Sequence, residues 1–176
     1  MIISNKLEYF YKENNLPEKG GENDRFFFIN LKLFTLKLPN PKFRRKVIHI
    51  HDVQHVLYDC DTTWKGESFI SGWEIATGMW KHLPIGLFSL SGMGVGVFLH
   101  PKEVYLGYKK GLECIGVIDL KIPKEQLINL SVSELKTIIQ KKKPSKLNWF
   151  SFLFWCFMGV LFNILPFLLL MIFFLF

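Results

Sequence analysis

The chain has 176 residues and a formal net charge of +7, from 22 Lys or Arg and 15 Asp or Glu. The basic residues are not interleaved with an aromatic platform, so we do not expect a nucleic-acid partner. Cys60, Cys114 and Cys156 are too few and too widely spaced for a disulfide framework or a CxxC zinc site. The charged first 25 residues lack the apolar run of a signal peptide.

The N-terminal third is predicted to combine a short helix with an extended segment. Residues 1–25 form an N-terminal segment, with a helix followed by a loop that contains Gly20 and Gly21. Residues 26–38 are aromatic and alternate in part, which predicts an extended segment or a strand. A helical domain that binds a metal is expected over residues 26–143.

Two helices are predicted in the middle of the chain. Asn40 is a suitable helix cap, and Pro41 at the first helical position loses no needed hydrogen-bond donor. This helix is expected to run from Pro41 to about Tyr58. After a loop, a second helix is expected from about Thr63 to Lys81.

The region after these helices is predicted to be helical as well. Residues 83–99 are uncharged and contain four glycines, which suggests close helix packing, one wall of an apolar groove, or an element that dips into a membrane. Further helices are expected at 104–111 and 123–143. Ser131 or Ser133 would cap the last of these, with Glu134 in its first turn.

Four residues of the middle helices form a candidate metal site. His51 and His55 are one helical turn apart, so both imidazoles can reach one ion, and Asp52 lies beside them. Eleven residues separate His55 from Glu67, which an antiparallel second helix would bring back against the histidines. Two imidazoles and two carboxylates suit Zn²⁺, Fe²⁺, Mn²⁺ or Co²⁺. The expected fold is therefore mainly α, with a divalent metal between two antiparallel helices.

An alternative for His51 and His55 is purely structural, because paired histidines at helical spacing often serve only to form hydrogen bonds in a protein core. Four further residues are considered outside this site. Glu74, seven residues after Glu67, is expected either to support a ligating histidine from outside the first coordination shell or to form an ordinary salt bridge. His49 is expected at the surface, and His82 and His100 are expected to be structural.

The C-terminal residues 147–176 are predicted to be a membrane anchor. They contain no charged residue and exceed the ~20 residues that a helix needs to cross a bilayer. Asn163 and Pro166 interrupt the run, so one kinked span and a re-entrant hairpin both remain open. The lysines that precede the segment predict that the domain faces the cytoplasm; they are Lys141, Lys142, Lys143 and Lys146.

The segment HDVQH, followed after eleven residues by Glu67, resembles the HDxxH-x11-E motif of the coenzyme Q biosynthesis protein 4 family. The residues 58–77, YDCDTTWKGESFISGWEIAT, are similar to bacterial members. So are Leu38-Pro39-Asn40, Arg44-Arg45 and the late NLSVSELKTII, which gives a likeness over roughly residues 20–140.

The resemblance implies that His51, Asp52, His55 and Glu67 bind a divalent metal. It also implies a helical, membrane-associated protein of ubiquinone biosynthesis that oxidatively decarboxylates or hydroxylates a polyprenyl-aromatic precursor. The alternative is a lipid-binding scaffold with a structural metal. Expected partners are membrane lipid, a prenylated quinone precursor, other quinone-biosynthesis proteins and a second copy of the chain. The shortness of the chain and its apolar C-terminus depart from the family and leave room for another lipid substrate.

Two other metal-dependent classes fit less well. An HD-type phosphohydrolase also requires an upstream His and a distant Asp, for which His49 is too close and Asp119 has no support. A membrane di-iron desaturase requires HxxHH boxes, which the sequence lacks.

Overall fold

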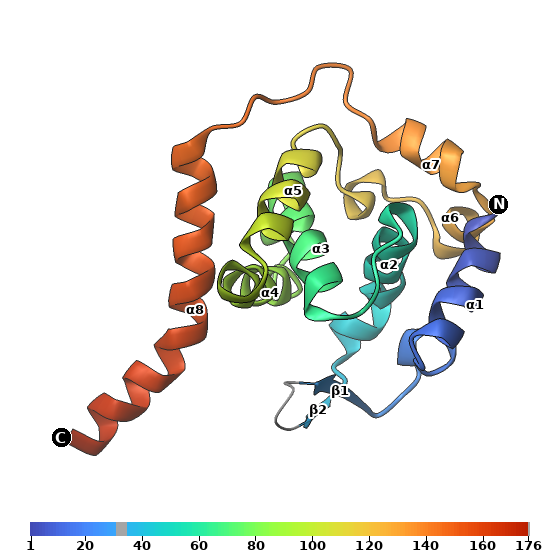
Figure 1. Cartoon of the computed structure of the whole chain (residues 1–176). Helices are drawn as coiled ribbons and strands as arrows, with labels where there is room; N and C mark the ends of the chain where they lie inside the picture. The colour runs from blue at the N-terminus through green and yellow to red at the C-terminus, as the bar shows by residue number, and fades with distance from the viewer. Residues whose placement is uncertain (31–34, 176) are drawn as a thin grey trace.

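The computed structural model describes residues 1–30 and 35–175, and this part of the chain is mainly helical (Figure 1). The predicted mainly α fold is confirmed. The α-helices are α1 (Ile3–Glu13), α2 (Lys42–Tyr58), α3 (Trp64–Thr77), α4 (Gly86–Leu99), α5 (Pro101–Gly111), α6 (Lys124–Asn129), α7 (Val132–Ile139) and α8 (Trp149–Leu175). Short 3-10 turns are η1 (Glu18–Gly21), η2 (Met79–Lys81) and η3 (Val117–Leu120), and two strands are β1 (Phe26–Asn30) and β2 (Thr35–Pro39).

The strands form an antiparallel pair in which Phe26 lies opposite Pro39. The predicted extended segment therefore folds back on itself, and each half provides the partner of the other. The part of this prediction that falls on residues 31–34 lies outside the described residues.

The start of α2 differs from the prediction. Pro41 occupies the cap position and makes no side-chain cap hydrogen bond. Asn40 is almost fully buried, and its Nδ2 donates to the carbonyl oxygens of Gly21 and Asp24, both at 3.0 Å. Its Oδ1 accepts from Arg44 at 3.1 Å. The prediction that Asn40 caps the helix is wrong, because its amide instead fastens the start of α2 to the loop after η1.

Helices α2 and α3 run antiparallel, as predicted. His55, late in α2, lies near Glu67, early in α3, whereas the earlier His51 lies near the later Glu74. The second helix ends four residues before its predicted limit. Gly78 takes a left-handed conformation with φ of 98°, which glycine adopts at little cost, and the chain continues as η2.

Two hydrophobic clusters meet at α3. One contains residues of α1, α2, α6 and α7 together with Trp73 of α3. The other contains Ile75 of α3 together with residues of α4, α5 and α8. In Figure 1, α3 accordingly lies between α2 on one side and α4 and α5 on the other. The N-terminal helix belongs to the first cluster through Ile3, Leu7 and Phe10, so residues 1–25 pack as part of the same body.

The helix predicted over 123–143 is divided into α6 and α7. Leu130 is extended, with φ of −70° and ψ of 152°, and separates the two. Ser131 then accepts a hydrogen bond from the Glu134 amide, and the Glu134 carboxylate accepts one from the Ser131 amide. This capping box confirms the first of the two predicted caps.

The described backbone of α8 is one continuous helix that contains Pro166. Its stretch Trp149–Pro166 is long and apolar enough to cross a membrane. Figure 1 shows α8 passing beside α4 and α5 before it extends away from the domain.

Candidate metal centre

Three side chains from α2 and α3 converge on one point. Donor atoms of His51, His55 and Glu67 all lie within 4.8 Å of one another, an arrangement that could hold a metal ion. The Nε2 atoms of the two histidines are 3.1 Å apart. One Glu67 oxygen lies 3.5 Å from His51 Nε2, and its other oxygen lies 3.5 Å from His55 Nε2.

The opposite nitrogen of each imidazole already has an acceptor. His51 Nδ1 lies 3.1 Å from Oε1 of Glu74, and His55 Nδ1 lies 3.2 Å from the carbonyl oxygen of Cys60. A carboxylate and a carbonyl can only accept, so each Nδ1 must carry a hydrogen. Ser89 of α4 donates to the second Glu74 oxygen at 2.6 Å and holds that carboxylate in place.

These partners leave the two Nε2 atoms pointing at each other. Two lone pairs 3.1 Å apart repel unless a proton or a cation lies between them. Nitrogens at ~2.05 Å from one tetrahedral ion are about 3.3 Å apart, which is close to the observed separation. The geometry of the two histidines therefore fits a shared ion, with Glu67 as a third ligand.

The cluster is closed on one side and open on the other. The His55 side chain is 1% exposed, whereas those of His51 and Glu67 are 31% and 32% exposed. An ion held by these three residues would have one accessible side, where an exogenous ligand could complete the coordination.

The ionisation of the cluster reflects this crowding. Burial lowers the pKa of His51, but Glu74 and Glu67 outweigh burial and hold that pKa well above its ordinary value. Burial lowers the pKa of His55, and Glu67 offsets this only in part. Burial raises the pKa of Glu67, but the two histidines and Arg44 outweigh it and lower that pKa. Without a metal, a proton on His51 Nε2 can therefore bridge to His55.

Asp52, the fourth predicted ligand, is held elsewhere. Its Oδ2 accepts a hydrogen bond from the Tyr11 hydroxyl at 3.0 Å, and it lies beside Gly20 of η1. Burial raises the pKa of Asp52 to about 6, while His51, Tyr11 and Arg44 oppose this rise. The converging group of donor atoms thus comprises three of the four predicted ligands.

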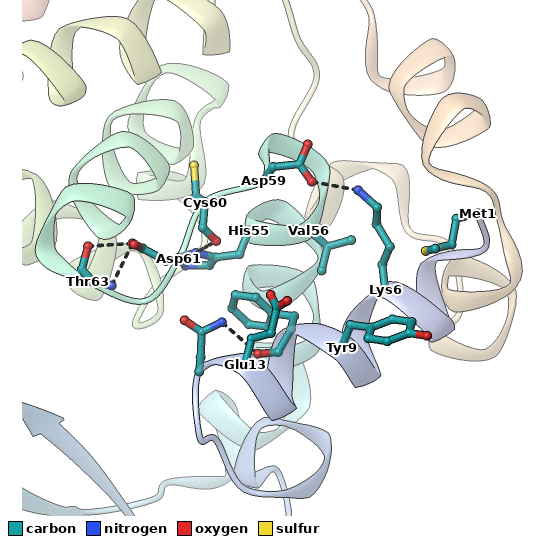
Figure 2. Close-up of a pocket in the computed structure, with 12 residues that line it drawn as sticks. Met1, Lys6, Tyr9, Glu13, His55, Val56, Asp59, Cys60, Asp61 and Thr63 are labelled. Atoms are coloured by element: carbon teal, nitrogen blue, oxygen red, sulfur yellow. Dashed lines mark hydrogen bonds and ion pairs between the residues drawn. The ribbon is translucent and has the colours of Figure 1, made fainter.

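A cavity of about 670 Å³ lies on the α1 side of His55 (Figure 2). Its walls come from α1 and from the end of α2 with the loop that follows. The Lys6–Asp59 ion pair, with an N–O distance of 2.8 Å, joins these walls. His55 is the member of the converging group that lines it.

One histidine outside the converging group was placed wrongly by the sequence. His49 is 8% exposed, so its predicted surface position is wrong, and burial lowers its pKa. His82, directly after η2, pairs with Asp119 of η3 at 2.8 Å. The sequence also offered no signal for Ser89, because a serine in an apolar helix has many possible partners.

Comparison with known proteins found no matching family model, no matching curated protein and no matching solved structure.

Proposed function

We propose that the chain is a divalent-metal protein in which His51, His55 and Glu67 hold the ion and a substrate reaches it from the open side. The observation that carries this proposal is the pair of facing Nε2 atoms 3.1 Å apart, each with its Nδ1 already bonded. A cation between the two Nε2 atoms would also balance the negative charge of Glu67 and of the buried Glu74.

The proposed substrate is a membrane-dissolved polyprenyl-aromatic acid, a precursor of ubiquinone. The resemblance of HDVQH and Glu67 to the coenzyme Q biosynthesis protein 4 motif supports this class, and the apolar α8 supports a membrane location. The lysines before α8 favour a domain on the cytoplasmic side. The proposed substrate class rests on the sequence likeness, and the proposed place of reaction is the accessible side of the metal site.

In the proposed reaction, the bond between the ring and its carboxyl group breaks and CO₂ leaves. A hydroxyl derived from dioxygen takes its place, and the second oxygen atom leaves as water after an external donor supplies two electrons and two protons. A bound divalent metal would supply Lewis-acid polarisation of the substrate or activation of dioxygen. Glu74 and the Cys60 carbonyl would keep the histidines in the orientation that presents Nε2.

A scaffold with a structural metal is the second candidate. The cluster joins α2 to α3, and His55 and Glu74 are both buried, so an ion here would also fasten the two helices together. This candidate predicts loss of folding stability in ligand variants and no turnover in the metal-loaded protein.

Elemental analysis of the detergent-purified full chain tests metal binding. The wild type should contain close to one divalent metal per chain, whereas His51→Ala and Glu67→Gln should contain almost none. His82→Gln is the matched control, because His82 pairs with Asp119 outside the converging group and its loss should leave metal content unchanged. Full metal content in both ligand variants would refute the site.

Turnover separates the two candidates. Metal-loaded protein, a polyprenyl-hydroxybenzoate, dioxygen and a reductant should yield CO₂ and the hydroxylated ring, and Glu67→Gln should yield neither. A metal-loaded protein that binds this lipid without converting it would favour the scaffold.

A further inference from the structure

The backbones of α4 and α8 touch where each helix has a glycine. A Cβ added at Gly94 of α4 would lie 2.2 Å from the carbonyl oxygen of Gly159 in α8. A Cβ added at Gly159 would lie 2.8 Å from the carbonyl oxygen of Leu90. Any side chain here would force the helices apart, so this contact is specific to glycine on both sides.

A polar clamp lies next to the glycine contact. Ser91 Oγ donates to Oδ1 of Asn163 at 2.6 Å, and Asn163 Nδ2 donates to the Ser91 carbonyl oxygen at 3.0 Å. Asn163 is one of the two interruptions in the apolar C-terminal sequence. An amide without partners is costly in an apolar environment, and α4 provides partners for both ends of this one.

Aromatic contacts secure the start of α8. Trp149 stacks on Tyr105 of α5, with ring centroids 5.6 Å apart and an angle of 6° between the planes. Tyr108 packs against Phe152, and its hydroxyl is 3.1 Å from Ser151 Oγ. The helix is therefore attached to the domain along its first four turns.

The outer side of α4 is apolar. The stretch from Leu83 to Leu99 has no charged residue, yet Phe98 is 71% exposed and Phe88 is 39% exposed. On α8, which packs against α4, the apolar side chains of Leu153, Phe154 and Phe157 are exposed as well. Several large apolar side chains exposed on neighbouring helices indicate a surface that is covered by another apolar phase.

The nearby charges favour a lipid bilayer as this phase. The connection before α8 carries Lys142, Lys143 and Lys146, all exposed, which would meet anionic headgroups. On α4, Phe88 contacts Phe27 of the hairpin, and the half-buried Arg44 lies 4.2 Å from the Phe27 ring centroid. Apolar side chains bordered by cations are typical of a membrane interface.

We propose that α4 enters the hydrocarbon region of one leaflet together with α8, as one packed unit. This proposal rests on the membrane location in the proposed function and extends it: the anchor is a fixed part of the domain. Because Ser89 of α4 also holds Glu74, and Glu74 holds His51, the inserted unit would set the position of the metal cluster relative to the bilayer.

Cysteine cross-linking in membranes tests the packing. In the full chain with its native cysteines replaced by serine, Ser91→Cys with Asn163→Cys should form an intramolecular disulfide under mild oxidation, identified by peptide mapping. The matched control is Ser91→Cys with Phe157→Cys, because Phe157 lies on the exposed face of α8 and should remain unlinked. If the two cysteine pairs formed disulfides to the same extent in a metal-loaded protein, the proposal that α8 is packed in a fixed position against α4 would be refuted.

Fluorescent labelling tests the insertion of α4. A polarity-sensitive probe on Phe98→Cys should shift to the blue and resist an aqueous quencher when phosphatidylcholine–phosphatidylglycerol vesicles are added. The same probe on Lys109→Cys, an exposed position of α5, should do neither. Equal quenching at both positions in vesicle-bound protein would overturn the insertion of α4 alone, whereas a protein that does not float with vesicles would overturn the membrane location as well.

Discussion

The orientation of His51 and His55 depends on groups that are not ligands. A histidine can offer either ring nitrogen to a metal, and the hydrogen bond made by the other nitrogen decides which one is free. Here a carboxylate and a carbonyl occupy the two Nδ1 atoms, so both Nε2 atoms face inward. Glu74 therefore contributes to the site as a positioning residue.

Replacing Glu74 by Gln should weaken metal binding about 10- to 100-fold, the range found for partners of ligating histidines. The amide can still accept from His51, but it lacks the charge that makes the imidazole a stronger ligand. The dissociation constant can be measured by competition with a chromophoric chelator. Glu113→Gln, which removes a carboxylate paired with Lys110 at the surface, should bind as tightly as the wild type. Equal weakening in the two variants would argue against the positioning role.

The sequence predicted the converging residues because helical spacing fixes which side chains share a face. His51 and His55 follow directly from this rule, and Glu67 follows from the length of the loop. Helical spacing does not reveal which residues from distant parts of the chain pack against a given helix face. Asp52 was placed beside the histidines correctly, but Tyr11 lies far away in sequence and binds its carboxylate. His49 was assigned to the surface for the same reason, since the elements that cover it come from distant segments.

At the scale of elements, the turn η1 shapes the pocket that receives Asp52. Gly20 has φ of 66°, and a Cβ at this position would lie 2.2 Å from Asp52 Oδ2. Gly21 has a similar φ of 72°, but its Cβ would meet the side chain of Asp24 at 2.9 Å. Both glycines avoid the strain of the left-handed conformation, while only Gly20 also leaves space for the buried carboxylate.

Gly20→Ala should therefore destabilise the protein more than Gly21→Ala. Each substitution introduces a left-handed alanine, which costs about 1–2 kcal/mol. Gly20→Ala must in addition displace Asp52 from Tyr11, which should add roughly 1 kcal/mol for the lost hydrogen bond. Urea unfolding followed by circular dichroism measures the difference. Equal midpoints for the two variants would mean that Asp52 moves freely.

Element boundaries were predicted where local signals are strong. The capping box at Ser131 and Glu134 is a local pattern, and it marks the start of α7 as expected. A helix that starts at Ser131 cannot be continuous with residues 123–130, so the single helix predicted over 123–143 was inconsistent with its own cap. The extended Leu130 divides it into α6 and α7. The hairpin shows the limit of local signals: the alternation of β1 and β2 indicates extended chain, but the pairing of the two halves comes from the fold.

At the scale of the whole molecule, α3 joins the two hydrophobic clusters, and the metal group joins α3 to α2. Trp73 packs with the N-terminal cluster and Ile75 with the cluster that includes α8. An ion held by His51, His55 and Glu67 would therefore strengthen the packing of α2 against α3, the helix that belongs to both clusters. Ligands that bind the folded state alone raise its stability by an amount set by their concentration relative to Kd.

Removal of the metal should lower the thermal midpoint of the wild type. A metal present at 100 times its Kd contributes ~2.7 kcal/mol, which corresponds to a shift of roughly 5–10 °C for a chain of this size. Differential scanning calorimetry of the detergent-solubilised chain, with and without EDTA, measures the shift. Glu67→Gln should have a low midpoint that EDTA does not change, because it lacks the carboxylate that faces both Nε2 atoms. A response to EDTA as large in this variant as in the wild type would mean that the ion binds elsewhere.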